Sequence, residues 1–226
     1  MSEVYTTSIV GPDGSGKTTT VDAVAGRLSK LAIVGVLASL RKPSYVMHKG
    51  NKKLLFPTLT SKITKLYEKG QDHNPLALFT SLLSYIAMQG RLVEPYIVKN
   101  YHPDFLLQDR HRMVDSISMS HHYVVAGIPI NVMRLAVEAI GGKRVTDDLI
   151  LLIITPETAV IRSQRRKQSD NHESVETIRQ MSAMYPAIID SLVRMGLVRN
   201  WTSINTEING PDIISQTVYS RIIEKK

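Results

Sequence analysis

The sequence predicts a three-layer α/β fold with about five parallel strands flanked by helices. Short apolar runs alternate with stretches whose apolar residues recur at helical spacing, which is the pattern of successive βα units. A glycine-rich loop joins the first apolar run to the first helical stretch. The 226 residues contain no linker rich in glycine, proline or serine, so we expect one domain over residues 1–226.

Five apolar runs are the expected strands. The first, residues 4–10, is rich in β-branched side chains and ends at a glycine, and residues 149–154 form the most apolar run. Strands of a parallel sheet are buried on both faces, so they read as nearly continuous apolar runs. The remaining expected strands are residues 32–40, 105–110 and 201–204.

Helices are expected between these strands. Residues 155–157, Thr-Pro-Glu, begin one of them with a threonine N-cap, a proline at the first position and an acid in the first turn. For residues 44–74, interrupted by glycine and proline, we expect a short helix and a loop. The other predicted helices start at Lys17, span residues 75–98, 129–140 and 174–195, and start near residue 211.

The glycine-rich loop, Gly-Pro-Asp-Gly-Ser-Gly-Lys-Thr at residues 11–18, matches the P-loop pattern. Its glycines let successive backbone N–H groups face one anion at the positive end of the following helix. Lys17 is expected to reach the β- and γ-phosphates, and the Thr18 hydroxyl to bind Mg²⁺. The residues expected to bind ATP are Gly11, Asp13, Gly14, Ser15, Gly16, Lys17, Thr18 and Thr19.

A charged pair, Asp109-Arg110, ends the predicted strand at residues 105–110. Residues just past the carboxyl ends of parallel strands line the ligand crevice. Asp109 is therefore expected beside the metal, together with Thr18. The neighbouring His111, like the adjacent pair at 121–122, is expected to pack or face solvent, because adjacent histidines do not share a face on which to bind a metal.

Composition narrows the classes of function. With 28 Lys and Arg against 20 Asp and Glu, the net charge is +8, which would suit a polyanion. No basic stretch is interleaved with aromatics at base-stacking spacing, so we expect phosphate binding rather than nucleic-acid binding. The absence of cysteine excludes disulfides and thiolate metal sites. Without a long apolar run or a secretory signal, a cytoplasmic protein with no membrane partner is expected.

Taken in order, these landmarks resemble the thymidylate kinase family of P-loop nucleoside monophosphate kinases, over nearly the whole chain. The resemblance implies a P-loop kinase fold, ATP as co-substrate, Mg²⁺, transfer of the γ-phosphoryl group to dTMP to give dTDP, and a homodimer. The residues that carry it are the P-loop with Asp13, Arg41-Lys42-Pro43, Asp109-Arg110-His111, Gly141-Gly142, Thr155-Pro156-Glu157, Arg162 and Arg166 with Asp170 and Glu173, and Tyr185.

Phosphoryl transfer explains why such residues recur. Negative charge spreads over equatorial oxygens in a loose transition state, so catalysis consists mostly of alignment and cationic stabilisation. The resemblance implies an Arg-rich lid at about residues 162–173, closing over the transferring group. The catalytic residues that it implies are Lys17, Asp109, Arg110, Arg162 and Arg166.

The acceptor half departs from the family pattern. The family's Arg-Glu-Pro-Gly-Gly-Thr becomes Arg-Lys-Pro-Ser-Tyr-Val at residues 41–46, which replaces an acid by a base. The arginine of the long middle helix is replaced by Tyr85 or Gln89, depending on the register. By resemblance, Arg41 and Arg110 grip the acceptor phosphate as bidentate donors, and Asp13 bonds the acceptor's 3′-hydroxyl. The expected acceptor contacts are Asp13, Arg41, Tyr85, Gln89 and Arg110.

Two other functions remain open at this point. One is a P-loop kinase of the same fold that acts on another nucleotide or on a nucleoside. The other is a non-catalytic ATP-binding switch associated with nucleic acid. A second phosphate grip from Arg41 and Arg110 favours a kinase, since a switch has no need of one.

Overall fold

A computed structural model describes residues 4–71, 75–114, 118, 135, 138–141, 145–165 and 174–225. Within these residues, seven strands form one sheet in the order β4-β3-β2-β5-β1-β6-β7. The five strands from β2 to β7 in this order pair in parallel, as predicted. They are β1 (Tyr5–Val10), β2 (Val34–Leu37), β5 (Phe105–Asp109), β6 (Thr146–Ile153) and β7 (Val198–Asn205).

An antiparallel hairpin extends the sheet beyond β2. It consists of β3 (Tyr45–His48) and β4 (Asn51–Leu54), joined by Lys49 and Gly50. Both linking residues have positive φ, 48° and 77°, as a two-residue hairpin turn requires. The expectation of a short helix and a loop over residues 44–74 was therefore wrong. The hairpin was not predicted because a lysine before the glycine is a weak turn signal. The helix that follows, α2 (Pro57–Gln71), is 15 residues long and therefore not short.

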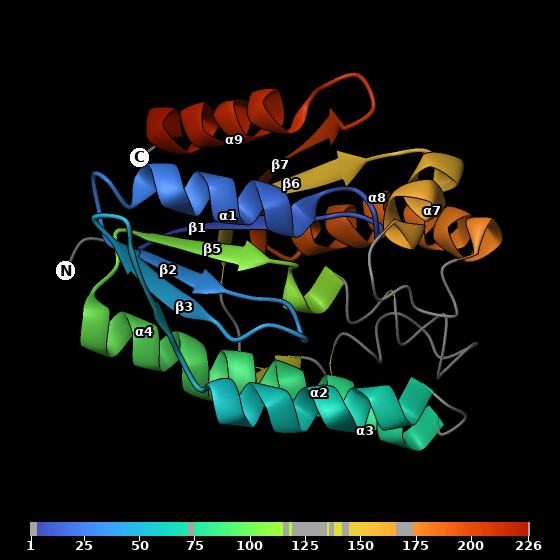
Figure 1. Cartoon of the computed structure of the whole chain (residues 1–226), viewed down its shortest axis with the longest axis horizontal. Coiled ribbons are helices and arrows are strands. Elements are labelled where there is room, and N and C mark those ends of the chain that lie inside the picture. Colours follow the sequence, from blue (N-terminus) through green and yellow to red (C-terminus); the bar gives the residue numbers. More distant parts are fainter. Residues whose placement is uncertain are drawn as a thin grey trace.

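Helices cover both faces of the sheet, which gives the predicted three layers (Figure 1). The first face carries α1 (Lys17–Leu28) and α9 (Pro211–Lys225), which pack against each other. The second face carries α3 (Pro75–Ala87), the π-helical segment η1 (Met88–Val93), α4 (Glu94–Tyr101) and α8 (Val175–Arg194), while α7 (Pro156–Gln164) packs on α8.

In the described part of the chain, no helix is long and apolar enough to cross a membrane.

Adjacent residues of a strand supply the two hydrophobic cores, because successive side chains point to opposite faces. Ile9 packs in the cluster that contains Val24 of α1 and Val218 of α9. The next residue, Val10, packs in the cluster that contains Ile188 of α8. β1 is thus buried on both sides, and the loop that follows it starts from a fixed point.

The predicted helix boundaries hold in most places. Residues 75–101 are helical almost as expected, although a π-helical turn at Met88–Val93 separates α3 from α4. The Thr155 side chain caps α7 by accepting a hydrogen bond from the Thr158 N–H at 3.4 Å, with Pro156 in the first turn. The predicted helix at 129–140 falls largely outside the described residues; Leu135 and residues 138–141 are helical.

Candidate functional site

The loop between β1 and α1 is shaped by close backbone contact. Gly14 has φ of 84°, and a Cβ there would lie 2.4 Å from the Ala159 carbonyl oxygen of α7. Only glycine combines this left-handed conformation with such a close approach. The hydroxyl of Tyr185, from α8, also donates to the Gly11 carbonyl at 3.1 Å. Two helices, α7 and α8, therefore contact the P-loop and hold its backbone in place.

The N-terminus of α1 faces this loop. Its N-cap is Gly16, which provides no side-chain cap, and no acid lies in the first turn. The Ser15 hydroxyl is buried and has no hydrogen-bond partner among the described residues. Uncapped N–H groups and the positive end of the helix dipole favour an anion at such a position. The geometry therefore fits the predicted phosphate site.

Lys17 and Arg110 meet at one carboxylate. The Lys17 side chain is 5% exposed, and its ammonium group donates to the Gly11 and Pro12 carbonyls at 2.7 Å each and lies 3.6 Å from Asp13 Oδ1. Arg110, from the turn after β5, forms an ion pair with the same oxygen. Asp13 therefore holds two cations, from different segments, at the mouth of the loop.

Thr18 and Asp109 are brought together by the pairing of β1 with β5. The register places Ile9 opposite Asp109, and the Thr18 hydroxyl donates to Asp109 Oδ2 at 2.7 Å. Asp109 is 2% exposed, and its Oδ1 has no hydrogen-bond partner among the described residues. A buried, unpartnered carboxylate oxygen beside a hydroxyl fits the oxygen ligands that Mg²⁺ prefers.

No group of three or more His, Asp or Glu side chains in the described chain could hold a metal by itself. Magnesium commonly binds through one or two protein oxygens together with waters and substrate phosphates. The Thr18 and Asp109 pair is the predicted metal site, and its donor set fits that pattern.

The turn after β5 has a strained backbone. Arg110 has φ of 83°, unusual for a residue with a side chain, and its N–H donates to the Ile9 carbonyl at 3.0 Å. His111 is buried, and its Nδ1 accepts from the Val114 N–H at 3.3 Å. Burial, with a smaller effect from Arg112, lowers the pKa of His111 to about 3. His111 is therefore a neutral packing residue, as predicted, and positions 121–122 lie outside the described residues.

The predicted acceptor residues of the middle helix are engaged with the chain itself. The Tyr85 hydroxyl donates to the Ala38 carbonyl at 2.9 Å. The Gln89 amide nitrogen lies 3.2 Å from the same carbonyl and 3.2 Å from the Ser44 hydroxyl. Both side chains are buried, at 6% and 2% exposure. The structure thus ties these residues to the segment after β2, and Arg41 of that segment lies over the Tyr67 ring, 5.5 Å from its centroid.

The predicted lid is described only at its start. Arg162 lies in the last turn of α7, where it donates to the Thr206 carbonyl at 3.1 Å and, at 3.4 Å, to the Thr206 hydroxyl. It therefore connects α7 to the turn after β7. Arg166, with the rest of the lid up to residue 173, lies outside the described residues.

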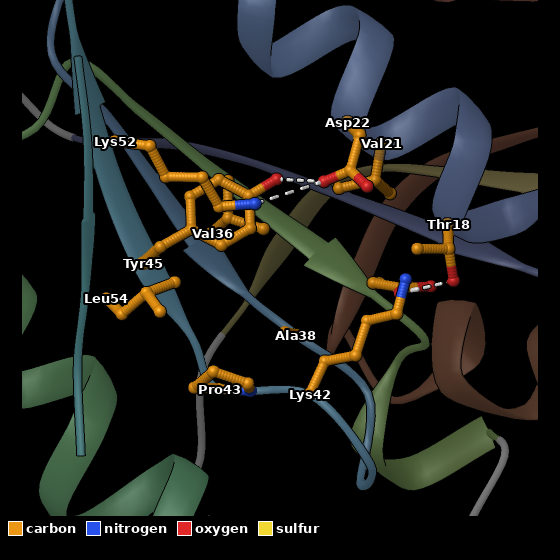
Figure 2. A pocket seen from close by; sticks show the side chains of 11 residues that line it. Thr18, Val21, Asp22, Val36, Ala38, Lys42, Pro43, Tyr45, Lys52 and Leu54 are labelled. Atoms are coloured by element: carbon orange, nitrogen blue, oxygen red, sulfur yellow. Dashed lines mark hydrogen bonds and ion pairs between the residues drawn. The ribbon is translucent and has the colours of Figure 1, made fainter. Parts of the chain in front are cut away.

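A cavity of about 310 Å³ adjoins the site and was not foreseen from the sequence (Figure 2). It lies beside the hairpin that sequence reasoning missed, and it reaches Thr18 and Asp109 at one end. Its other lining residues include Asp22 of α1, Lys42 of the loop after β2 and Lys52 of β4. Lys42 had appeared in the sequence as part of the Arg41-Lys42-Pro43 segment and as a base where the family pattern has an acid, whereas no sequence pattern had pointed to Asp22 or Lys52.

No family model matches this sequence, and no curated protein sequence matches it. Among solved structures, deoxyadenosine kinase from M. mycoides, with dCMP and a flexible dCDP bound as products, is similar over 97% of this chain and 99% of its own. The TM-score is 0.65 and the sequence identity 13%. The likeness shows that this chain has a P-loop kinase fold. Thymidylate kinase membership stays a prediction.

Proposed function

We propose that this chain is an ATP-dependent phosphotransferase that moves the γ-phosphoryl group to a nucleoside monophosphate, with dTMP as the first candidate. The observation that carries the proposal is the position of Asp13, which bonds Lys17 of the P-loop and Arg110 of the β5 turn. A loop that only bound ATP would need the first cation. A second cation, from the turn after β5, supports transfer to an acceptor, because negative charge spreads over the oxygens of the transferring phosphoryl group and lies on the acceptor phosphate as well.

We propose ATP as the phosphate donor and Mg²⁺ as the metal ion, both bound at the P-loop and the end of β5. Thr18 and Asp109 would hold the ion, which is supported by the unpartnered Oδ1 of Asp109. Bound Mg²⁺ would neutralise charge on the β- and γ-phosphates. Lys17 would exchange its hydrogen bonds to loop carbonyls for bonds to phosphate oxygens.

On the acceptor side, Arg41 and Arg110 are proposed to bind the acceptor phosphate, and Asp13 its sugar. Arg162 and Arg166 are proposed to stabilise the transferring group. Direct contact of Tyr85 and Gln89 with the acceptor stays a prediction, because their polar groups bond Ala38 and Ser44. By resemblance we also propose a homodimer, which light scattering of the purified protein would test, and a location in the cytoplasm, which cell fractionation would test.

A nucleoside is the second candidate acceptor. The observation that favours it is the similarity to deoxyadenosine kinase over nearly all of both chains. The 13% identity means that substrate preference need not follow the fold. The two candidates differ in whether the acceptor already carries a phosphate.

An acceptor panel tests the proposal. Purified protein with ATP and Mg²⁺ is incubated with each nucleoside monophosphate and each nucleoside, and ADP formation and the phosphorylated product are measured. We expect turnover with at least one monophosphate, and none when Mg²⁺ is replaced by a chelator. Binding of ATP without consumption of any acceptor would contradict the proposal and favour a nucleotide-dependent switch.

A further inference from the structure

The cavity beside the phosphate site lies on the α1 face of the sheet. Its lining includes Val21 of α1 and Val36 of β2, which belong to the apolar cluster on that face. Tyr85, the predicted acceptor contact, belongs to the cluster on the opposite face. The Tyr85 side chain and the cavity therefore lie on opposite faces of the sheet, on either side of Ala38, which lines the cavity and whose carbonyl accepts the Tyr85 hydrogen bond.

The far end of the cavity is polar. The Tyr45 hydroxyl donates to Asp22 Oδ1, and the Lys52 ammonium lies 3.8 Å from the same oxygen and 3.6 Å from the centroid of the Tyr45 ring (Figure 2). Burial and the hydrogen bond to Asp22 raise the pKa of Tyr45, so the phenol stays protonated. This end thus presents a carboxylate acceptor next to an ammonium donor, which matches the edge of a planar group carrying both donors and acceptors.

The near end of the cavity adjoins the place of phosphoryl transfer. Thr18 and Asp109 line it, and Figure 2 shows the Lys42 side chain pointing from the loop after β2 toward Thr18. Lys42 replaces the acid of the thymidylate kinase pattern, so a cation stands at the point where an acceptor phosphate would approach the metal. Between the two ends, the lining is apolar, with Val36 and Leu54.

We propose that this cavity is the acceptor site and takes a nucleoside monophosphate, with the edge of its base at Asp22 and Lys52. Its phosphate would lie at the Thr18 end, where Lys42 would bind it together with Arg41 and Arg110. This inference rests on the proposed phosphotransferase function. The volume is at the lower end of the range of small-molecule pockets, roughly 300–1,000 Å³. On the opposite face, Tyr85 and Gln89 bond the backbone and side chain of the segment after β2, so their role is to fix the floor of the acceptor site.

Two adjacent lysines of β4 give a matched test. Lys52 lies at the Tyr45 ring, whereas Lys53 lies on the other face of the hairpin, 5.4 Å from the centroid of the Tyr101 ring. We expect Lys52→Ala and Asp22→Asn each to raise the acceptor KM about tenfold, as loss of one charge-assisted hydrogen bond would. The ATP KM should stay unchanged in both variants, and Lys53→Ala should leave both constants at wild-type values.

The rival location is tested by Gln89→Leu. If Gln89→Leu raised the acceptor KM while Lys52→Ala and Asp22→Asn behaved like Lys53→Ala, the acceptor would bind on the opposite face and this inference would be overturned. Circular dichroism of each variant checks the fold, and calorimetric titration of the acceptor without ATP gives its Kd independently of turnover. Wild-type protein that binds ATP but turns over no acceptor would instead overturn the proposed function itself.

Discussion

The donor half and the acceptor half of the candidate site are built in different ways. The donor half consists of the P-loop and the end of β5, and its contacts depend on backbone conformation and strand register. The acceptor half consists of the hairpin after β2 and the helical stretch at residues 85–94, and its contacts depend on individual side chains. A site defined by backbone conformation requires particular residues at a fixed spacing in the sequence. A site defined by individual side chains can change to fit a different ligand, and no fixed spacing marks it.

The largest expected effect tests the donor half. Lys17→Ala should lower the rate of phosphoryl transfer at least about 100-fold, because it removes the cation that stabilises charge on the transferring group. Steady-state assays with the acceptor identified by the panel measure this, and Lys30→Ala, at an exposed position in the turn after α1, is the control. Retention of most of the activity in Lys17→Ala would show that the P-loop does not bind a reacting phosphate.

The rigidity of the donor half can be tested through its glycines. Gly14→Ala combines a left-handed φ with a Cβ 2.4 Å from the Ala159 carbonyl, whereas Gly50→Ala in the hairpin has a similar φ of 77° and meets no atom within 4 Å. Gly14→Ala should therefore destabilise the protein by about 1–3 kcal/mol more than Gly50→Ala. Urea unfolding measures both, and equal losses would mean that α7 yields freely to the loop.

Substitution of Arg41 tests the acceptor half. Arg41→Ala should raise the acceptor KM about tenfold and leave the ATP KM unchanged, because a bidentate phosphate contact is lost. Arg179→Ala, an exposed arginine of α8 paired with Glu157 and Glu176, is the matched control. An unchanged KM and kcat in Arg41→Ala would remove this residue from the acceptor site.

A last prediction, on stability and not on activity, concerns His111, which follows Arg110 at the junction of the two halves. Its pKa is about 3 in the folded chain against an ordinary 6.5, so the unfolded chain binds the proton first as the pH falls. The stability that neutral His111 contributes is therefore present above pH 6.5 and lost between pH 6.5 and 3, by up to about 1.4 kcal/mol per pH unit.

The control for this effect is His111→Asn, which keeps an acceptor near the Val114 N–H and does not titrate. Urea unfolding between pH 5 and 8 compares the two proteins. Wild-type stability should fall relative to that of the variant below pH 6.5. Parallel pH profiles would show that His111 is not held neutral by the fold.

The sequence was sufficient for the parallel core of the sheet and for the P-loop. Gly11 and the charged pair at Asp109 each stand at the end of a predicted strand, so their places at the ends of β1 and β5 could be predicted from the sequence. The register of β1 and β5 then brings these two strand ends together. The hairpin was missed because a Lys-Gly turn is a weak signal next to Asn-Gly or Asp-Gly. The partners of Tyr85 and Gln89 could not be foreseen, since they depend on how residues 38–44 fold back onto the middle helix.

The buried pair of Arg112 and Glu94, 2.7 Å apart, shows the same limit. It joins the segment after β5 to the helix that follows the π-helical turn, 18 residues away in sequence. Neither residue has a spacing that identifies its partner, because an ion pair across two elements depends on the crossing of those elements. Opposite charges 18 residues apart are common by chance.

The hairpin has one more consequence, for solubility. β4 is the last strand at its end of the described sheet, and all four of its residues are exposed. An open strand edge can pair with the edge of another molecule and begin aggregation. Lys52 and Lys53 place two positive charges side by side on this edge, pointing to opposite faces, so a second copy approaching from either side would meet like charge. An acceptor-binding hairpin would thus also keep the protein from polymerising through its sheet.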